Sequence, residues 1–380
     1  MPPSSDSPVV LQVLPSLVTG GVERGTVEIA QAIAEADATA LVASAGGPLV
    51  HQVERAGGIH IALPLTTKSP IGIWRNAAAL EALIRDRKVS VVHARSRAPA
   101  WSAWLACQRT GVPFVTTYHG TYGEGVPLKR FYNGVMARGR IVIAASHFIA
   151  DLVRTRHGVD AARIRVIPRG VDPAVFDPAM VSGKRIAKLA AEWRLPDTVR
   201  VVTLPGRLTS WKGHPVLLDA IARLNRPEVM CVLVGAHQGR HGYARELERQ
   251  ATRLGIAERV RMVGQCDDMP AALCLSDVVV HASIKPEAFG RVVIEAQAMS
   301  RPVIASDLGG PVETVRHGET GWRVPPNDPD ALAAAIAVAL DLDADGRLAL
   351  GQRARASVPT VRAMQDATLD VYETVLTETA

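Results

Sequence analysis

Two glutamates, Glu287 and Glu295, frame the segment P-E-A-F-G-R-V-V-I-E-A-Q-A-M, whose residue types could bind a phosphate and a sugar together. The first follows an apolar, β-branched run, and the second lies in an amphipathic pattern that predicts a helix over residues 291–299. A helix start binds anions through its free N–H groups, and carboxylates beside it accept hydrogen bonds from hydroxyls. A nucleotide-sugar would suit such a site. The alternative is that the two acids only complement the helix dipole.

Two cations, Arg207 and Lys212, occur in the segment P-G-R-L-T-S-W-K-G-H, which follows a strand predicted at residues 199–204. Cations at the carboxyl end of a strand, beside a glycine turn, are placed to neutralise a diphosphate. The alternative is an ordinary basic loop.

The first half of the chain has its own polar residues where predicted strands end. The pair Gly20 and Gly21 follows a strand over residues 9–14, and glycines there let a ligand approach the backbone, unless they only form a tight turn. Their spacing is not G-x-G-x-x-G, and no acid is placed for a ribose about 20 residues further on, which argues against a dehydrogenase. His119 ends a strand over residues 113–118, where a histidine either contacts a ligand or has a structural role.

The segment H-A-R-S-R places His93, Arg95 and Arg97 at the end of a strand over residues 89–93. In open α/β sheets the carboxyl ends of the strands face the ligand crevice. We therefore expect these three side chains to face a cleft, where two arginines would hold an acidic acceptor or a phosphate.

Length and composition predict two α/β domains. A chain of 380 residues is too long for one ordinary core, and 48% hydrophobic with 21% charged residues is typical of a folded protein. Short Val/Ile-rich runs alternate with helix-forming segments, which favours parallel sheets in two halves joined near residues 172–198. The four cysteines are widely spaced, so neither a disulfide framework nor a zinc site is indicated. Because no signal peptide or spanning segment is recognised, we expect a cytoplasmic protein.

The net charge of +6 lies entirely in the first half. Residues 1–178 contain 19 basic and 13 acidic residues, whereas the rest of the chain contains 24 of each. A basic half indicates an anionic partner, either a membrane surface or an acidic acceptor, unless it is only a solvated surface. The segment L-K-R-F-Y-N-G-V-M-A-R-G-R could lie against the inner face of a membrane, or be an ordinary surface helix. Nucleic acid is disfavoured, because only 4% of residues are aromatic and no binding module is present.

Several motifs occur together in an order that indicates a family. They are G-R-L-T-S-W-K-G, V-G at Val234-Gly235, P-E-A-F-G-R-V-V-I-E-A-Q-A-M and P-V-I-A-S-D-L-G-G, preceded by the glycine pair and the His-Gly of the first half. Over essentially the whole chain this set resembles the retaining nucleotide-sugar glycosyltransferases of the family-4 type. The segment H-A-R-S-R-A-P-A-W-S further resembles bacterial enzymes that build lipopolysaccharide or related envelope glycans.

The resemblance implies the GT-B fold, in which two Rossmann-like domains face each other across a cleft. An N-terminal, acceptor-binding domain would comprise residues 1–178, and a C-terminal, nucleotide-sugar-binding domain residues 179–356. A last helix within residues 357–380 would pack back on the first domain.

The resemblance also implies a role for each polar residue singled out above. Arg207 and Lys212 would bind the diphosphate, Glu295 the ribose, and Glu287 the donor sugar together with the backbone from Phe289 through Gly290 to Arg291. Gly20 and Gly21 would let the first domain close over the diphosphate, and His119 would lie beside the anomeric carbon. The candidate catalytic residues are His119, Arg207, Lys212 and Glu287. Family members typically retain the anomeric configuration without a metal or cofactor. Because no residue stands out as a covalent nucleophile, a same-face displacement is favoured over a double displacement.

One departure leaves the donor open. Many relatives have an apolar residue after F-G, where this chain has Arg291, so a UDP-, GDP- or ADP-sugar each fits. The alternatives to a glycosyltransferase acting on a glycan or glycolipid are a sugar-nucleotide epimerase, a soluble-sugar synthase and a non-catalytic nucleotide-sugar-binding protein.

Overall fold

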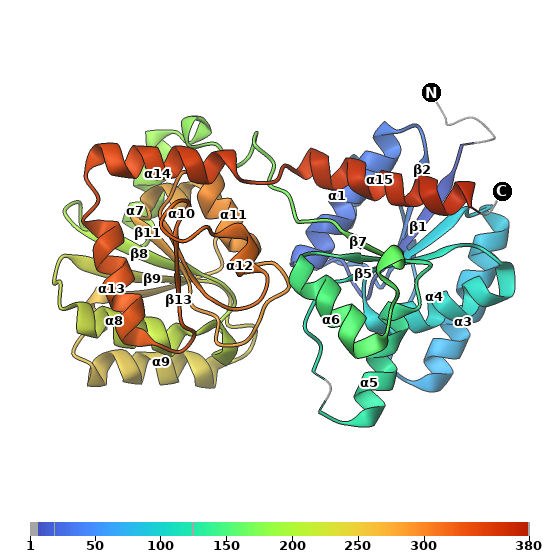
Figure 1. Cartoon of the computed structure of the whole chain (residues 1–380), viewed down its shortest axis with the longest axis horizontal. Helices are drawn as coiled ribbons and strands as arrows, with labels where there is room; N and C mark the ends of the chain where they lie inside the picture. The colour runs from blue at the N-terminus through green and yellow to red at the C-terminus, as the bar shows by residue number, and fades with distance from the viewer. Residues whose placement is uncertain (1–6, 19, 124, 379–380) are drawn as a thin grey trace. The chain divides into compact units, whose positions relative to one another are not determined.

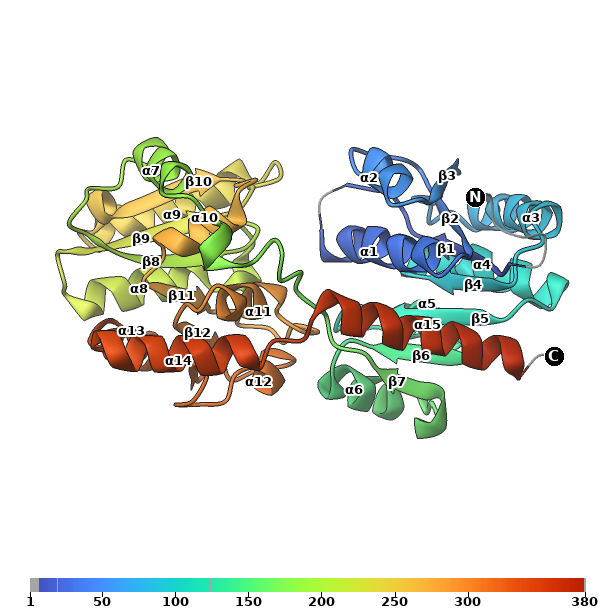
Figure 2. The same ribbon diagram turned by 90° about the horizontal axis from the view of Figure 1, so that it is seen from above.

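The computed structural model describes residues 7–18, 20–123 and 125–378, and it divides the chain into two compact units. Unit 1 comprises Met1–Pro168 and Val361–Ala380, and unit 2 comprises Arg169–Thr360. The sequence predicted the boundary between the two units after residue 178 and the return to the first unit at residue 357 instead. Each unit is built around one parallel sheet with helices packed against it (Figures 1 and 2).

The sheet of unit 1 has the strand order β3-β2-β1-β4-β5-β6-β7, with every neighbouring pair parallel. The strands are β1 (Val9–Val13), β2 (Thr39–Ser44), β3 (Ile59–Ala62), β4 (Val91–Ala94), β5 (Phe114–Tyr118), β6 (Ile141–Ala144) and β7 (Ile164–Val166). Its central strands are apolar at almost every position, because helices cover the sheet. The direction of winding reverses between β1 and β4, and such a switch point leaves a crevice at the carboxyl ends of the strands.

The last helix of the chain belongs to unit 1. The α-helices of this unit are α1 (Gly21–Glu35), α2 (Val50–Arg55), α3 (Pro70–Asp86), α4 (Arg97–Thr110), α5 (Pro127–Asn133), α6 (His147–His157) and α15 (Val361–Thr377). Figures 1 and 2 show α15 alongside α1, and Gln365 of α15 donates a hydrogen bond to the carbonyl of Glu28 at 2.7 Å. Val371, Tyr372 and Val375 complete the apolar core under the sheet.

Unit 2 repeats the same winding with the order β10-β9-β8-β11-β12-β13, again all parallel. The strands are β8 (Arg200–Pro205), β9 (Val229–Val234), β10 (Val260–Gly264), β11 (Val278–His281), β12 (Val303–Ser306) and β13 (Trp322–Val324). The α-helices are α7 (Gly183–Glu192), α8 (His214–Leu224), α9 (His241–Arg253), α10 (Met269–Leu275), α11 (Arg291–Ala298), α12 (Pro311–Thr314), α13 (Pro329–Leu340) and α14 (Ala344–Ala356). The switch point here lies between β8 and β11.

Both sheets have the alternating strand and helix order of Rossmann-like domains, which confirms the predicted α/β class. Within the described residues, no helix has the length and apolar character needed to cross a bilayer.

Candidate functional site

The carboxylate of Glu287 is held by three side chains at the switch point of unit 2. Lys212 Nζ lies 2.7 Å from Oε1 and 2.9 Å from Oε2, and His281 Nε2 lies 2.7 Å from Oε1. The hydroxyl of Ser283 also donates to Oε1. Burial alone raises the pKa of Glu287, but its interactions with His281 and Lys212 outweigh burial and hold the pKa well below its usual range. Glu287 is therefore an anion at neutral pH.

A glycine lets Lys212 reach this carboxylate. Lys212 ends a single 3₁₀ turn, Ser210–Lys212, after β8, and Gly213 follows it with a φ of 73°. A Cβ atom at Gly213 would collide with the carbonyl of Ala282, which follows β11. The K-G pair thus brings the lysine against the end of the neighbouring strand.

The start of α11 supplies the second part of the site. Gly290 precedes the helix in the left-handed conformation, with φ 80° and ψ 59°. Phe289 is buried, so only its backbone can contact a ligand. One turn into the helix, Glu295 is 5% exposed and its Oε1 lies 3.2 Å from Nε of Arg291.

A cavity of about 540 Å³ opens at the carboxyl ends of β8, β9 and β10. Its lining includes Leu208, Gly235, His237, His241 and Met262. The rings of the two histidines lie 4.2 Å apart between centroids. The lining also includes Arg245 and Glu248. The apolar residues and the two imidazole rings, which are tilted by 47° to each other, suit a planar aromatic group such as a nucleobase. Arg207 directly precedes Leu208, which lines this cavity, and the side chain of Arg207 is exposed.

Three further predicted site residues belong to unit 1. Gly20 caps α1 and Gly21 begins it, and a side chain at Gly20 would collide with the carboxylate of Glu23. His119 directly follows β5 and is half-buried. The glycine pair follows the carboxyl end of β1, and His119 follows the carboxyl end of β5.

The expectation that His93 and Arg95 face a cleft is wrong. His93 is fully buried, with Nδ1 2.6 Å from the hydroxyl of Tyr372 and Nε2 2.6 Å from Oγ1 of Thr117. Arg95 is 2% exposed, and its NH1 donates to Oε1 of Gln12 at 3.1 Å. Burial lowers the pKa of Arg95. Helix α15 covers this end of β4, so neither side chain reaches solvent.

Arg97 differs, because it begins α4 and stays half-buried. Its NH1 donates to Oδ1 of Asn133 at 2.9 Å, and its guanidinium stacks 4.2 Å from the ring centroid of Tyr122. Of the three residues, it alone keeps access to the surface.

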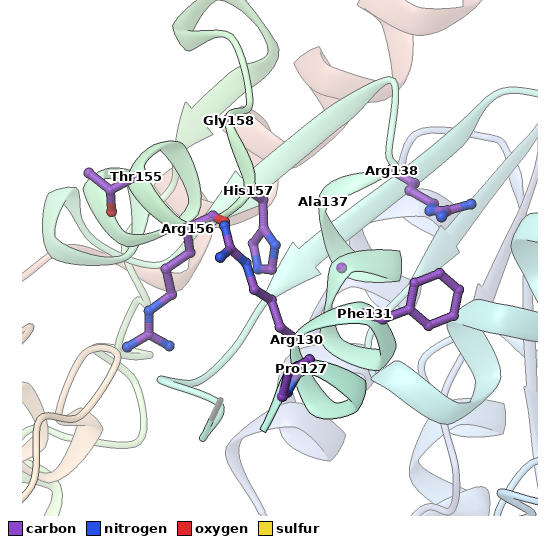
Figure 3. A pocket seen from close by; sticks show the side chains of 10 residues that line it. Pro127, Arg130, Phe131, Ala137, Arg138, Thr155, Arg156, His157 and Gly158 are labelled. Carbon is purple, nitrogen blue, oxygen red and sulfur yellow. The ribbon is translucent and has the colours of Figure 1, made fainter. Parts of the chain in front are cut away.

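A basic groove of about 780 Å³ lies between α5 and the end of α6 in unit 1 (Figure 3). Arg130, Arg138, Arg156 and His157 line it, and among the described residues its lining contains no acidic side chain. Phe131, 60% exposed, forms part of its wall. The groove combines positive charge with an exposed aromatic ring.

In the described part of the chain, no three His, Cys, Asp or Glu side chains gather as a metal site requires. The prediction of metal-independent activity stays a prediction.

Sequence analysis missed His281 and Ser283. The available signal was their position, because a histidine at the carboxyl end of the strand before Glu287 faces the same crevice. The apolar run V-V-V-H-A instead suggested only a buried strand.

Comparison with known proteins identifies the family. A family model for glycosyl transferases group 1 matches residues 186–357, and one for Glycosyltransferase Family 4 matches residues 19–175. A D-inositol 3-phosphate glycosyltransferase of Xylanimonas cellulosilytica is 33% identical over 309 residues, 74% of this chain and 71% of that protein. This chain belongs to the family-4 glycosyltransferases.

Other similarities agree with this family. The D-inositol 3-phosphate glycosyltransferase of Jonesia denitrificans is 31% identical, and the match covers 70% of this chain and 66% of that protein, just under two thirds. The crystal structure of a glycosyltransferase from Rickettsia africae is 35% identical with a TM-score of 0.90, covering 98% of this chain and 99% of that one. Anabaena HepE in complex with UDP and glucose is 25% identical with a TM-score of 0.85, covering 96% and 99%. The two Rossmann-like units of this glycosyltransferase are therefore those of a GT-B enzyme.

Proposed function

We propose that this glycosyltransferase moves a sugar from a nucleoside-diphosphate donor to a phosphate-bearing glycan or glycolipid of the cell envelope, without a metal and with retention of configuration. The observation that carries the proposal is the Lys212–Glu287 pair beside the start of α11, at the switch point of unit 2. The fold thus places a cation, a carboxylate and the start of a helix close together, although Lys212 and Glu287 are 75 residues apart in the chain.

The proposed donor roles follow from this chemistry. Lys212 and the exposed Arg207 bind the diphosphate, and their charges stabilise it as it leaves. Glu287 accepts hydrogen bonds from hydroxyls of the donor sugar, with the backbone from Phe289 to Arg291 alongside. Glu295 accepts from the ribose, and the cavity beside Leu208 receives the base.

In the proposed transfer, a hydroxyl oxygen of the acceptor bonds to the anomeric carbon on the face that the phosphate leaves. The bond from that carbon to the phosphate oxygen breaks, and the hydroxyl proton passes to the departing phosphate. The diphosphate carries the electron pair of the broken bond, and Arg207 and Lys212 compensate its growing charge. His119 is proposed to lie beside the reacting sugar. No covalent intermediate on the enzyme is required.

A UDP-sugar is the first donor to test, because HepE was crystallised with UDP and glucose. GDP- and ADP-sugars remain in the panel, because Arg291 departs from the usual family residue. Calorimetric titration of the purified protein with the panel, with and without EDTA, tests the donor proposal. Binding of one nucleotide-sugar that is unchanged by EDTA is expected. Absence of binding across the panel, or binding only with a divalent metal, would contradict it.

An acceptor with a phosphate is supported by the names of relatives. D-inositol 3-phosphate glycosyltransferases, and a phosphatidyl-myo-inositol mannosyltransferase of Mycobacterium leprae that is 30% identical, are named for acceptors that carry phosphate. The basic excess in residues 1–178 favours an acceptor that carries negative charge. Lipopolysaccharide precursors and phosphoinositol compounds both meet this description, and radiolabel transfer from the identified donor to each would distinguish them.

We further propose a peripheral contact between unit 1 and an anionic membrane on its cytoplasmic side. Leu128 and Phe131 of α5 are 77% and 60% exposed, next to the arginines of the basic groove. Exposed apolar side chains flanked by cations are typical of segments that bind the membrane interface.

A further inference from the structure

The two carboxylate oxygens of Glu287 have different surroundings. Oε1 accepts from His281, Ser283 and Lys212, which exceeds the capacity of its two lone pairs for ideal hydrogen bonds. Oε2 accepts from Lys212, at 2.9 Å. Oε2 is therefore the oxygen with capacity left for a ligand hydroxyl.

Lys212 is also the mobile member of this cluster. Its ammonium group is carried on a flexible chain from a short 3₁₀ turn, and it binds both oxygens of Glu287 here. His281 and Ser283 are 3% and 1% exposed, and His281 belongs to the central strand β11. The carbonyl of His281 accepts a hydrogen bond from Ser306 of β12 at 3.3 Å. His281 is thus held by the sheet and Ser283 is buried two residues beyond it, whereas Lys212 contacts Glu287 through a side chain with several rotatable bonds.

We propose that His281, assisted by Ser283, is a positioning residue that keeps Glu287 ionised and presents its Oε2 to the donor sugar while Lys212 turns to the diphosphate. The inference rests on the donor roles proposed above for Lys212 and Glu287. It adds a hand-over: the lysine neutralises the carboxylate before a donor binds, and the histidine and serine hold the carboxylate once the lysine binds phosphate.

The hand-over is needed because a buried carboxylate that loses its cation takes up a proton. A protonated Glu287 would present a hydroxyl group in place of an acceptor oxygen. Nε2 of His281 must carry a proton, since it faces a carboxylate oxygen at 2.7 Å. Nδ1 is buried and has no hydrogen-bond partner among the described residues. The imidazole therefore acts through its Nε2–H, a group that the side-chain amide of glutamine can imitate.

The charged groups connected to Glu287 are few. Lys285, two residues before Glu287, is exposed. Lys212 also acts on His214 of α8, where burial, reinforced by the charge of Lys212, outweighs hydrogen bonds and lowers the pKa to about 4. His214 is neutral at physiological pH and does not replace the lysine. Arg291 of α11 pairs with Glu295.

The test removes the lysine and asks whether the histidine still keeps Glu287 ionised. Urea unfolding is followed from pH 4 to 8 for Lys212→Met, for Lys212→Met with His281→Leu, and for Lys212→Met with His281→Gln. The free energy of unfolding of each variant is compared with that of the same variant carrying Glu287→Gln. The difference between the two free energies reports on the carboxyl group. No ligand is needed.

The contribution of the Glu287 carboxyl group to the free energy of unfolding should depend on pH differently in the three variants. In Lys212→Met the folded pKa of Glu287 stays below the unfolded value of about 4.3, so the difference is constant from about pH 5 upward and declines only towards acid. Adding His281→Leu leaves burial dominant and raises the folded pKa. The difference in stability should then fall as pH rises from about 4 to 7. His281→Gln should restore the constant profile. A constant profile with His281→Leu would overturn the inference.

A second readout covers variants that do not fold. Single His281→Leu and His281→Gln variants are titrated with the donor found in the panel and with its nucleoside diphosphate alone. Leucine should weaken the nucleotide-sugar at least about tenfold and the nucleoside diphosphate less, since both ligands draw Lys212 away from Glu287 but only the sugar also needs Oε2. Glutamine should stay within about threefold of wild type for both ligands. Equal affinities for all variants would overturn the role of His281. Wild-type protein that binds no nucleotide would instead overturn the donor function and the hand-over with it.

Discussion

At the scale of single residues, the Lys212–Glu287 pair is better explained by ligand binding than by folding. Their side chains are 12% and 14% exposed. A pair this buried contributes little net stability, because the cost of desolvating both charges offsets their attraction. A carboxylate with a strongly lowered pKa at a switch point supports the proposed role of Glu287 in donor binding.

Replacing Lys212 with alanine should lower turnover by more than about tenfold, because one charge-assisted contact with the leaving diphosphate is lost. Replacing the exposed Arg207 should act in the same direction. Lys184→Ala is the control, since this lysine is exposed on α7, a helix that packs on α10. Initial rates with the donor identified by calorimetry provide the measurement. Near-normal rates for Lys212→Ala would remove the lysine from the mechanism.

Glu295 should contribute to affinity rather than to the chemical step. Glu295→Ala is expected to raise the dissociation constant of both the nucleotide-sugar and the free nucleoside diphosphate by about tenfold, because a ribose hydroxyl loses its charged acceptor. Glu258→Ala, at an exposed position of the same unit, should change neither. Calorimetric titration measures all four values. If Glu295→Ala binds both ligands normally, the ribose role is wrong.

At the scale of elements, the strand and helix that flank Glu287 were predictable from the sequence. The β-branched run and the amphipathic pattern placed both, and α11 ends at Ala298, one residue short of the expected end. Helix α14 was not predicted, because its sequence has few apolar residues. It forms because Leu350 and Ala354 are buried and α14 packs on α11. In the junction predicted near residues 172–198, helix α7 is short, since Ser182 caps its start and the chain adopts a left-handed conformation at Arg194.

Gly290 should be necessary for the geometry of the site. Gly290→Ala imposes a left-handed φ of 80° on a residue with a Cβ atom, which would also lie 2.7 Å from Cγ of Pro311. The expected loss of unfolding free energy is about 1–3 kcal/mol, with weaker donor binding. Gly242→Ala is the control, because α9 has open space there and alanine should stabilise the helix by up to about 1 kcal/mol. Urea unfolding distinguishes the two, and equal stabilities would contradict the argument.

At the scale of the whole molecule, the sequence predicted two Rossmann-like units but could not predict what covers the strand ends. His93 begins a polar segment that looks like part of a site. The hydroxyl of Tyr372 nevertheless contacts the His93 ring, from a helix 279 residues further along the chain. Patterns within a segment cannot reveal such a contact. His281 shows the opposite error, because an apolar strand pattern concealed a polar partner of Glu287. Long-range packing decides which polar strand ends reach a ligand.

The uneven charge of the molecule leads to a prediction about membranes. The protein should bind vesicles of phosphatidylcholine mixed with phosphatidylglycerol more strongly than phosphatidylcholine alone, and added salt should weaken binding, because each arginine near the surface contributes about 1 kcal/mol. Changing Leu128 and Phe131 of α5 to aspartate should abolish sedimentation with these vesicles, since apolar area is lost and negative charge is added. Val338→Asp on α13, 52% exposed in unit 2, is the control and should bind normally. Equal loss in both variants, or binding that ignores lipid charge, would place the membrane contact elsewhere or exclude it.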